Sequence, residues 1–154
     1  MKKIIIAIDS FKGCLTSAEA GKAAEKGIKS INPFCHTSVI PIADGGEGLL
    51  DVLITATKGK YITLSAHGPL MKMAKTHYGL SGNGRTAIIE MAAISGLPLV
   101  PIEQRNPMLT TTFGTGELIK DALNKGCRNF IIGIGGSATN DAGLGMLQAL
   151  GSAF

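Results

Sequence analysis

The sequence predicts an α/β protein in which a parallel βαβ part is followed by a second, mixed α/β part. Up to residue 66, short apolar runs alternate with helical patterns, which is the order found in βαβ units. Further on, two extended segments are separated by only four residues, too few for the crossover that parallel strands need. Of the 154 residues, 45% are hydrophobic, so the chain can bury a sizeable core.

The first strand and helix have clear boundaries in the sequence. Residues 4–8 form a β-branched run that ends at Asp9, as expected of a buried strand in a parallel sheet. The pattern Thr-Ser-Ala-Glu at 16–19 is a capping box, which satisfies free backbone amides at a helix start. A helix is therefore predicted over about 17–30, ending before Asn32-Pro33.

A second strand and helix follow. Residues 39–42 are predicted as a strand, and residues 43–48 as a glycine-rich loop. The apolar stretch that begins at Leu49 predicts a helix that ends near Gly59. This alternation favours a parallel sheet within residues 1–66.

The pattern changes near His67, where we expect a second domain to begin. Residues 73–80 and 85–91 are predicted as antiparallel strands joined by Ser-Gly-Asn-Gly at 81–84, a typical hairpin turn. The predicted domains are therefore 1–66 and 67–154.

The rest of the second domain is predicted to alternate between helix and strand again. We expect a loop over 96–106, a helix over 116–124, a strand over 130–134 and a helix over 141–150. The hairpin followed by this alternation makes the second domain mixed.

Composition and charge exclude several classes of function. The net charge is +4, but the basic residues are scattered rather than grouped, so no nucleic-acid partner is expected. No apolar stretch approaches the length that spans a membrane, so no membrane partner is expected. The three cysteines lack C-x-x-C spacing and are expected to be reduced thiols of a cytoplasmic protein. The oligomeric state is left open.

Glycine is unusually frequent, and its positions indicate a ligand. Many of the 21 glycines lie in four loops that each precede a predicted helix, at 9–13, 43–48, 110–117 and 133–145. Backbone amides at a helix start attract anions, and glycine lets a phosphate approach closely. One such loop is ordinary strand-to-helix connection chemistry, but four in one chain favour a phosphate site.

Four acidic residues in these loops bear on the chemistry: Asp9, Asp44, Glu47 and Asp141. A carboxylate beside a phosphate repels it unless a metal ion intervenes, so these acids indicate magnesium or a general base. The alternative is helix capping, which the spacing favours for Glu47 and which is also open for Asp141. Asp9 follows the first strand, where open parallel sheets place their ligands.

Two other patterns are weaker. Residues 133–138 match the dinucleotide fingerprint G-x-G-x-x-A, which keeps an NAD-dependent oxidoreductase as a further alternative. A Walker phosphate loop is absent from the sequence. The adjacent pair Cys35-His36 lacks an orienting carboxylate, so nucleophilic catalysis by the thiol is not expected.

Four segments together resemble the bacterial glycerate kinases: IAIDSFKG at 6–13, IPIADGGEG at 40–48, RNPMLTTTFGTGELI at 105–119 and IGIGGSATNDAGLGMLQALG at 132–151. The segments between them fit the family as well, so the resemblance covers essentially the whole chain. It implies a two-domain α/β enzyme whose first domain is Rossmann-like and whose active site lies in the cleft between the domains.

The resemblance also implies an activity, the phosphorylation of D-glycerate to phosphoglycerate by ATP with Mg²⁺. It leaves open whether the 2- or the 3-hydroxyl receives the phosphate. Members of the family are longer, so we expect a partial Rossmann-like parallel domain and the start of a second mixed α/β domain, both incomplete. The alternative is a non-catalytic fragment or gene remnant without independent activity.

Carried over onto these motifs, the resemblance gives Asp44, Asp9 and Lys12 as candidate catalytic residues. Asp44 or Asp9 would act as the base or hold the metal, and Lys12 would neutralise phosphate or bind the glycerate carboxylate. Arg105 would clamp a carboxylate, the alternative being a surface ion pair. The candidate residues for binding substrate and phosphate are Ser10, Gly45, Gly46, Glu47, Arg105, Thr111, Thr112, Gly114, Thr115, Gly116, Gly135, Gly136, Ser137, Asn140 and Asp141.

Overall fold

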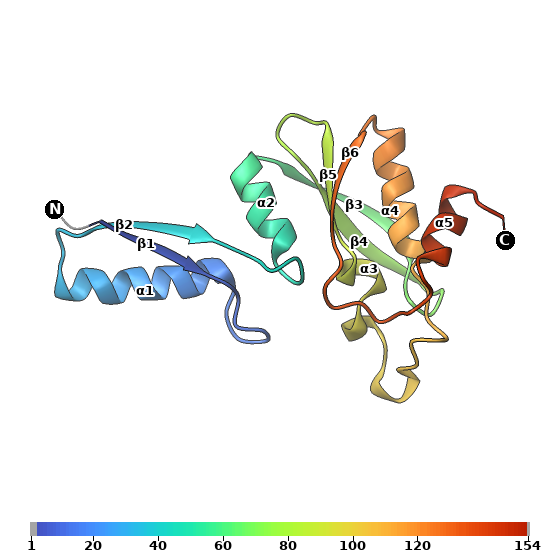
Figure 1. The fold of residues 1–154 in the computed structure, drawn as a ribbon, viewed down its shortest axis with the longest axis horizontal. Coiled ribbons are helices and arrows are strands. Elements are labelled where there is room, and N and C mark those ends of the chain that lie inside the picture. The colour runs from blue at the N-terminus through green and yellow to red at the C-terminus, as the bar shows by residue number, and fades with distance from the viewer. Residues whose placement is uncertain (1–2, 154) are drawn as a thin grey trace.

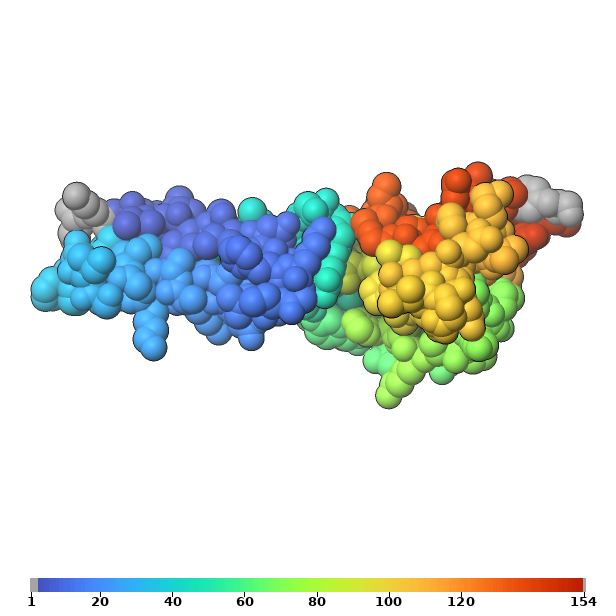
Figure 2. Space-filling view, turned by 90° about the horizontal axis from the view of Figure 1, so that it is seen from below, coloured from blue at the N-terminus to red at the C-terminus, as the bar shows by residue number. Residues whose placement is uncertain are grey.

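The computed structural model describes residues 3–153. The molecule is elongated, with a small N-terminal part at one end and a larger part at the other (Figure 1). A perpendicular view shows the same two parts along the long axis (Figure 2). The small part contains a two-stranded sheet and the large part a four-stranded sheet, and helices pack on both. The predicted α/β class is confirmed.

The N-terminal part is a single βαβ unit. β1 (Lys3–Ile8) and β2 (His36–Pro41) pair in parallel, as predicted. α1 (Ser17–Ile31) covers one face of this pair (Figure 1). Gly21 lets the helix lie close to the sheet, because a Cβ at that position would clash with the Val39 side chain.

The start of α1 forms as the sequence predicts. The Thr16 side chain accepts a hydrogen bond from the backbone amide of Glu19, and the Glu19 carboxylate accepts one from the amide of Thr16. β2 differs from the prediction, since it begins at His36 rather than Val39. The reason is its pairing, in which all six residues of β2 lie opposite residues of β1.

The large part is built on a mixed sheet in the order β3 (Lys60–His67), β4 (Met73–Leu80), β5 (Thr86–Glu90) and β6 (Asn129–Gly133). The predicted hairpin is confirmed, because β4 and β5 are antiparallel. β3 is antiparallel to β4, and β6 is parallel to β5.

Helices pack on both faces of this sheet (Figure 1). α2 (Leu49–Thr57) packs on β4 and β5 on one face, where Leu50 and Ile54 are buried against Ile88. α4 (Phe113–Asn124) packs on β3 and β5, and α5 (Leu144–Leu150) packs on α4. The larger core lies on this second face.

The expected domain boundary lies within a strand of the large sheet. β3 was not predicted, although its side chains alternate in burial. The expected boundary between residues 66 and 67 falls inside β3, whose pairing with β4 runs from Lys60 to His67. The chain leaves the first sheet after Pro41, and α2 already packs on the second sheet. The change of architecture therefore lies in residues 42–48.

The segment after β5 also differs in detail. The expected loop over 96–106 contains two 3₁₀ turns, η1 (Leu97–Leu99) and η2 (Ile102–Gln104), preceded by α3 (Ala92–Ser95). α4 begins three residues before the predicted start at residue 116, and α5 begins at Leu144 rather than at residue 141. Both shifts change the setting of predicted site residues.

Candidate active site

A cavity of about 430 Å³ lies where the two parts of the molecule meet. One wall is the loop after β1 with the start of α1, residues 9–19. A second wall comes from the end of β2 and from residues 47–55. The large sheet adds His77 of β4 and Glu90 of β5. Residues from both parts of the chain therefore form a single cavity.

The loop after β1 carries three predicted site residues into this cavity: Asp9, Ser10 and Lys12. The Asp9 carboxylate accepts the amide hydrogen of Ser10 at 2.7 Å. A tight turn follows, in which Gly13 has a φ of +73°, a conformation that favours glycine. Within residues 3–153, the Lys12 ammonium has no ion-pair partner. Lys12 is thus available to an anionic ligand.

Ser17 fixes the position of this loop, although the sequence pattern marked it only as part of a helix start. Its buried hydroxyl donates to the carbonyl of Ile8 at 2.6 Å and accepts the amide hydrogen of Ile42 at 3.0 Å. Ile8 ends β1 and Ile42 directly follows β2, so one side chain ties together the points where both strands end.

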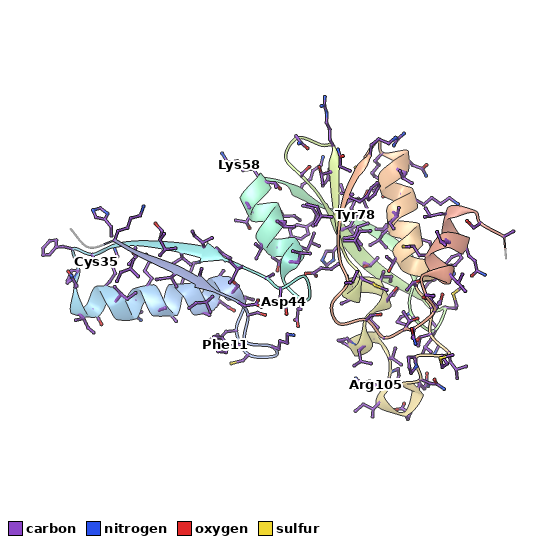
Figure 3. All side chains as sticks on the ribbon, viewed as in Figure 1. Phe11, Cys35, Asp44, Lys58, Tyr78 and Arg105 are labelled. Carbon is purple, nitrogen blue, oxygen red and sulfur yellow. The ribbon has the colours of Figure 1, made fainter. Side chains whose placement is uncertain are left out.

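The loop at 43–48 approaches the cavity from the other side. The Asp44 carboxylate accepts the amide hydrogen of Gly46 at 3.0 Å, which closes a turn. Figure 3 shows Asp44 in the connection between the two parts, near the loop that carries Phe11. Glu47 lines the cavity, whereas Asp44 and the two glycines that follow it do not.

The glycines of this loop pack against the loop after β6. The amide of Gly135 donates to the carbonyl of Gly45 at 3.2 Å. A Cβ on Gly135 would lie 2.6 Å from the Cα of Gly46, and a Cβ on Gly133 would lie 2.6 Å from the carbonyl oxygen of Gly45. These glycines therefore permit close contact between two backbones. Their predicted contact with phosphate stays a prediction.

Glu90 is a cavity residue that the sequence analysis missed. Its carboxylate accepts the amide hydrogen of Leu50 at 3.0 Å, in the first turn of α2. Burial raises the pKa of Glu90, and the neighbouring charge of Asp51 adds to this, while amides at the start of α2 oppose the rise. The sequence did contain a signal for Glu90, because this residue lies at the carboxyl end of a buried strand. Asp9 was chosen as a candidate for its place at the carboxyl end of the first strand.

Two further polar residues of the cavity were also missed, Asp51 of α2 and His77 of β4. Asp51 accepts a hydrogen bond from the Tyr61 hydroxyl at 2.5 Å. That bond, together with burial, raises the pKa of Tyr61 to about 12, so the phenol stays protonated at neutral pH. The His77 ring packs edge-on against Tyr61. Neither residue belongs to a recognisable motif, and only tertiary packing brings them to the cavity.

Asp141 lies in a different region, where its carboxylate caps the starts of two helices, α4 and α5. It accepts hydrogen bonds from the amide and hydroxyl of Thr112, both at 2.8 Å, and from the amides of Gly143 and Gly145. Burial acts to raise the pKa of Asp141, but these bonds outweigh it and hold the pKa below its ordinary value. The capping alternative for Asp141 therefore describes the structure.

The glycines at 114 and 116 are not in a free loop but inside α4, with Thr115 between them. All three are buried. A Cβ on Gly114 would clash with the His67 backbone, and one on Gly116 would clash with the backbone of Met146. The Thr115 hydroxyl bonds to the Ser95 hydroxyl at 2.9 Å. These residues belong to the first turn of α4, which starts earlier than predicted and packs closely, and their predicted contact with substrate or phosphate stays a prediction.

The remaining candidates lie in the loops around Asp141. The backbone amide of Asn140 donates to the Pro107 carbonyl at 3.0 Å, and the Ser137 hydroxyl donates to the Thr139 carbonyl at 3.3 Å. Arg105 donates from Nε to the Val100 carbonyl at 3.2 Å. Figure 3 shows Arg105 far from Asp44, in the loop below the large sheet. Neither Thr111, whose hydroxyl accepts the Phe113 amide hydrogen, nor Gly136 lines the cavity.

The structure thus brings Asp9, Ser10, Lys12 and Glu47 together at one cavity and places Asp44 beside it. It also corrects the reasoning about helix starts. Amides at the starts of α2, α4 and α5 bond to Glu90, Asp141 and Thr112, so these are not free for an anion. Within residues 3–153 there is no cluster of three or more His, Cys, Asp or Glu that could hold a metal by itself. None of the described helices is long and apolar enough to cross a membrane.

Known proteins with similar sequences and structures share one description. A model of the "Glycerate kinase family" matches residues 4–154. Glycerate kinase of Haemophilus influenzae is 58% identical over 97% of the chain, and glycerate 2-kinase of Escherichia coli is 53% identical over 97%. A crystal structure assigned as glycerate kinase 2 of Salmonella typhimurium superposes with a TM-score of 0.84 at 50% identity over 98% of the chain.

The match covers the chain almost entirely but only part of each relative. The chain spans 39% of the length of the H. influenzae and E. coli proteins and 41% of the Salmonella chain. The matched family model spans nearly every described residue, including both sheets and the cavity between them. The chain belongs to the glycerate kinase family.

Proposed function

We propose that the cavity forms part of the active site of a kinase that transfers phosphate from ATP to D-glycerate and yields phosphoglycerate. The observation that carries the proposal is the convergence of Asp9, Ser10, Lys12 and Glu47, from two separate motifs, on one cavity. Family membership supports ATP as the phosphate donor and glycerate as the acceptor.

The charges of the cavity indicate how anionic substrates would be held. Its lining includes five carboxylates, on Asp9, Glu19, Glu47, Asp51 and Glu90, but only one lysine. Both ATP and glycerate are anions, so carboxylates alone would repel them. A cation must therefore accompany the substrates.

Magnesium fits this donor set. It binds through one or two carboxylates together with phosphate oxygens and water, so it needs no cluster of protein ligands. Asp9 and Glu47 offer oxygen donors on opposite walls of the cavity. Bound with the nucleotide, Mg²⁺ supplies neutralisation of the charge on the transferring phosphate.

The chain's own residues would position the reaction. Lys12, which has no ion pair within residues 3–153, would bind phosphate or the glycerate carboxylate. In the transfer, a glycerate hydroxyl oxygen bonds to the γ-phosphorus, the bond to the bridging oxygen breaks, and ADP leaves. Asp44 or Asp9 would accept the hydroxyl proton. Asp9 lines the cavity, whereas Asp44 lies in the loop that brings Glu47 to it, so either carboxylate remains a candidate for the base.

A hybrid protein tests the proposal. Residues 4–154 would replace the matching 39% of E. coli glycerate 2-kinase, and ADP release with D-glycerate would be measured. We expect turnover that depends on D-glycerate, and we expect the Lys12→Ala change to lower kcat/KM by about tenfold or more through loss of charged contacts. Lys26→Ala is the control, because Lys26 is exposed on α1 and does not line the cavity. Equal rates for both variants would remove Lys12 from the site.

The alternative is that the 154-residue chain is a fragment without independent activity. Its length, about 40% of that of its relatives, favours this alternative for the isolated chain. Assaying the chain and the hybrid side by side distinguishes the two: turnover only in the hybrid supports the fragment. We also propose a cytoplasmic location, supported by the free thiols of Cys14 and Cys127.

A further inference from the structure

We propose that Glu90 is a positioning residue for the reaction, acting through the start of α2 on the loop that carries Asp44 and Glu47. The inference rests on the proposed function and assigns Glu90 a role that no sequence motif indicates. It starts from the way in which α2 begins.

α2 lacks a cap of its own. Its N-cap is Gly48, which has no side chain, adopts a φ of +91° and makes no side-chain capping bond. The first amides of a helix have no acceptor within the helix, so a partner must come from elsewhere. For Leu50 that partner is the Glu90 carboxylate, at 3.0 Å and forty residues further along the chain.

Glu90 is itself rigidly held. It is the last residue of β5, an inner strand of the large sheet, and pairs with Gly133 of β6. Within residues 3–153 it forms no ion pair with a lysine, arginine or histidine. Its carboxylate is partly buried and directed at the start of α2, where the helix dipole favours a negative charge. The sheet therefore supplies a fixed anionic anchor.

The anchor decides where the 43–48 loop lies. At one end the loop contacts the backbone of the 133–135 loop, through the bond from Gly135 to Gly45. At the other end it continues into α2, which Glu90 holds. Glu47 stands between these two attachments and lines the same cavity as Glu90. Loss of the Glu90 carboxylate would remove the polar attachment at the start of α2, so that only the apolar packing of Leu50 and Ile54 would hold the end of the loop next to Glu47.

Hydrogen exchange at the Leu50 amide, followed by NMR on the 154-residue chain, tests the anchor itself. We expect Glu90→Ala to speed exchange at Leu50 by about ten- to a hundredfold, the range for loss of one hydrogen bond to a charged group. Glu90→Gln keeps an acceptor oxygen, so exchange at Leu50 should speed up less than in Glu90→Ala. Glu103→Gln is the control, because Glu103 is exposed in η2 and does not line the cavity. An unchanged Leu50 rate in Glu90→Ala would overturn the proposal.

Kinetics of the hybrid enzyme test the consequence for the reaction. We expect Glu90→Ala to lower kcat by about tenfold or more with little change in KM, and Glu90→Gln to restore part of the loss, because misplaced groups slow the transfer more than binding. An active hybrid in which Glu90→Ala leaves kcat unchanged, or in which the Gln variant equals the Ala variant, would refute the positioning role. A hybrid without turnover before any substitution would instead count against the proposed function.

Discussion

The cavity loops and the loops around Asp141 look alike in sequence but use their polar groups differently. Both are rich in glycine, hydroxyl and carboxyl residues and precede helices. At the cavity, Lys12 and Glu47 face open space. Around Asp141, hydroxyl and carboxylate groups bond to backbone and to each other, as between Thr112 and Asp141. Glycine-rich loops before helices can thus either line a cavity or join two helices, and the hydrogen bonds of their polar side chains distinguish the two.

The largest expected effect is a loss of turnover when a carboxylate of the cavity loops is changed. In the hybrid enzyme, Asp44→Asn should lower kcat by about 10²- to 10⁴-fold if Asp44 is the base, while the amide oxygen still closes the turn with Gly46. ADP release with D-glycerate measures it, with Glu103→Gln as control. Near-normal turnover would exclude Asp44 from the chemistry.

The second effect concerns stability around Asp141. Asp141→Ala removes the acceptor for the Thr112 amide and for amides of the next helix start, and should lower the free energy of unfolding by about 3 kcal/mol. Urea unfolding of the 154-residue chain measures it. If the variant is as stable as the original but the hybrid loses turnover, Asp141 belongs with the cavity residues and the comparison fails.

The same carboxylate makes a smaller, pH-dependent contribution. Because the folded-state pKa of Asp141 is lowered, its ionised form stabilises the fold above the ordinary pKa of about 4, and this contribution is lost as the pH falls toward the folded-state value. Asp141→Asn should flatten the fall in the free energy of unfolding as the pH drops below about 4. A dependence identical to that of the original chain would show that Asp141 is not responsible.

The smallest expected changes in the free energy of unfolding come from alanine substitutions at two glycines. Gly135→Ala should destabilise the chain by about 1–3 kcal/mol, because the new Cβ would lie 2.6 Å from the Cα of Gly46. Gly27→Ala, inside α1 with open space around it, should stabilise the chain by about 0.5–1 kcal/mol. Urea unfolding measures both, and equal effects would contradict the close contact of the two loops.

The sequence predicted helices and strands well where their boundaries depend on residues that are neighbours in the chain. The capping box at Thr16 and the four-residue turn at 81–84 fixed a helix start and a hairpin, because each depends on neighbours in sequence. β3 escaped prediction because only Lys58 and Gly59 separate it from α2. The domain boundary at residues 66 and 67 stays a prediction.

The site was less predictable, since its geometry depends on distant partners. Four residues that the motifs suggested line one cavity: Asp9, Ser10, Lys12 and Glu47. Sequence alone could not show which acceptors the helix-start amides would find. Glu90 reaches α2 across forty residues, and Asp141 reaches Thr112 across 29. Such pairings are set by the sheet and not by local spacing.

The contact between the 43–48 loop and the loop after β6 has a consequence for the order of folding. β1, α1 and β2 are close in sequence, so this unit can form from nearby contacts. Contacts between residues far apart in sequence carry a larger loop-closure entropy and form late. The bond from Gly135 to Gly45 joins residues ninety positions apart. During synthesis from the N-terminus, the cavity therefore reaches its final shape only after β6 has been made, long after the lysine and carboxylates of its first wall.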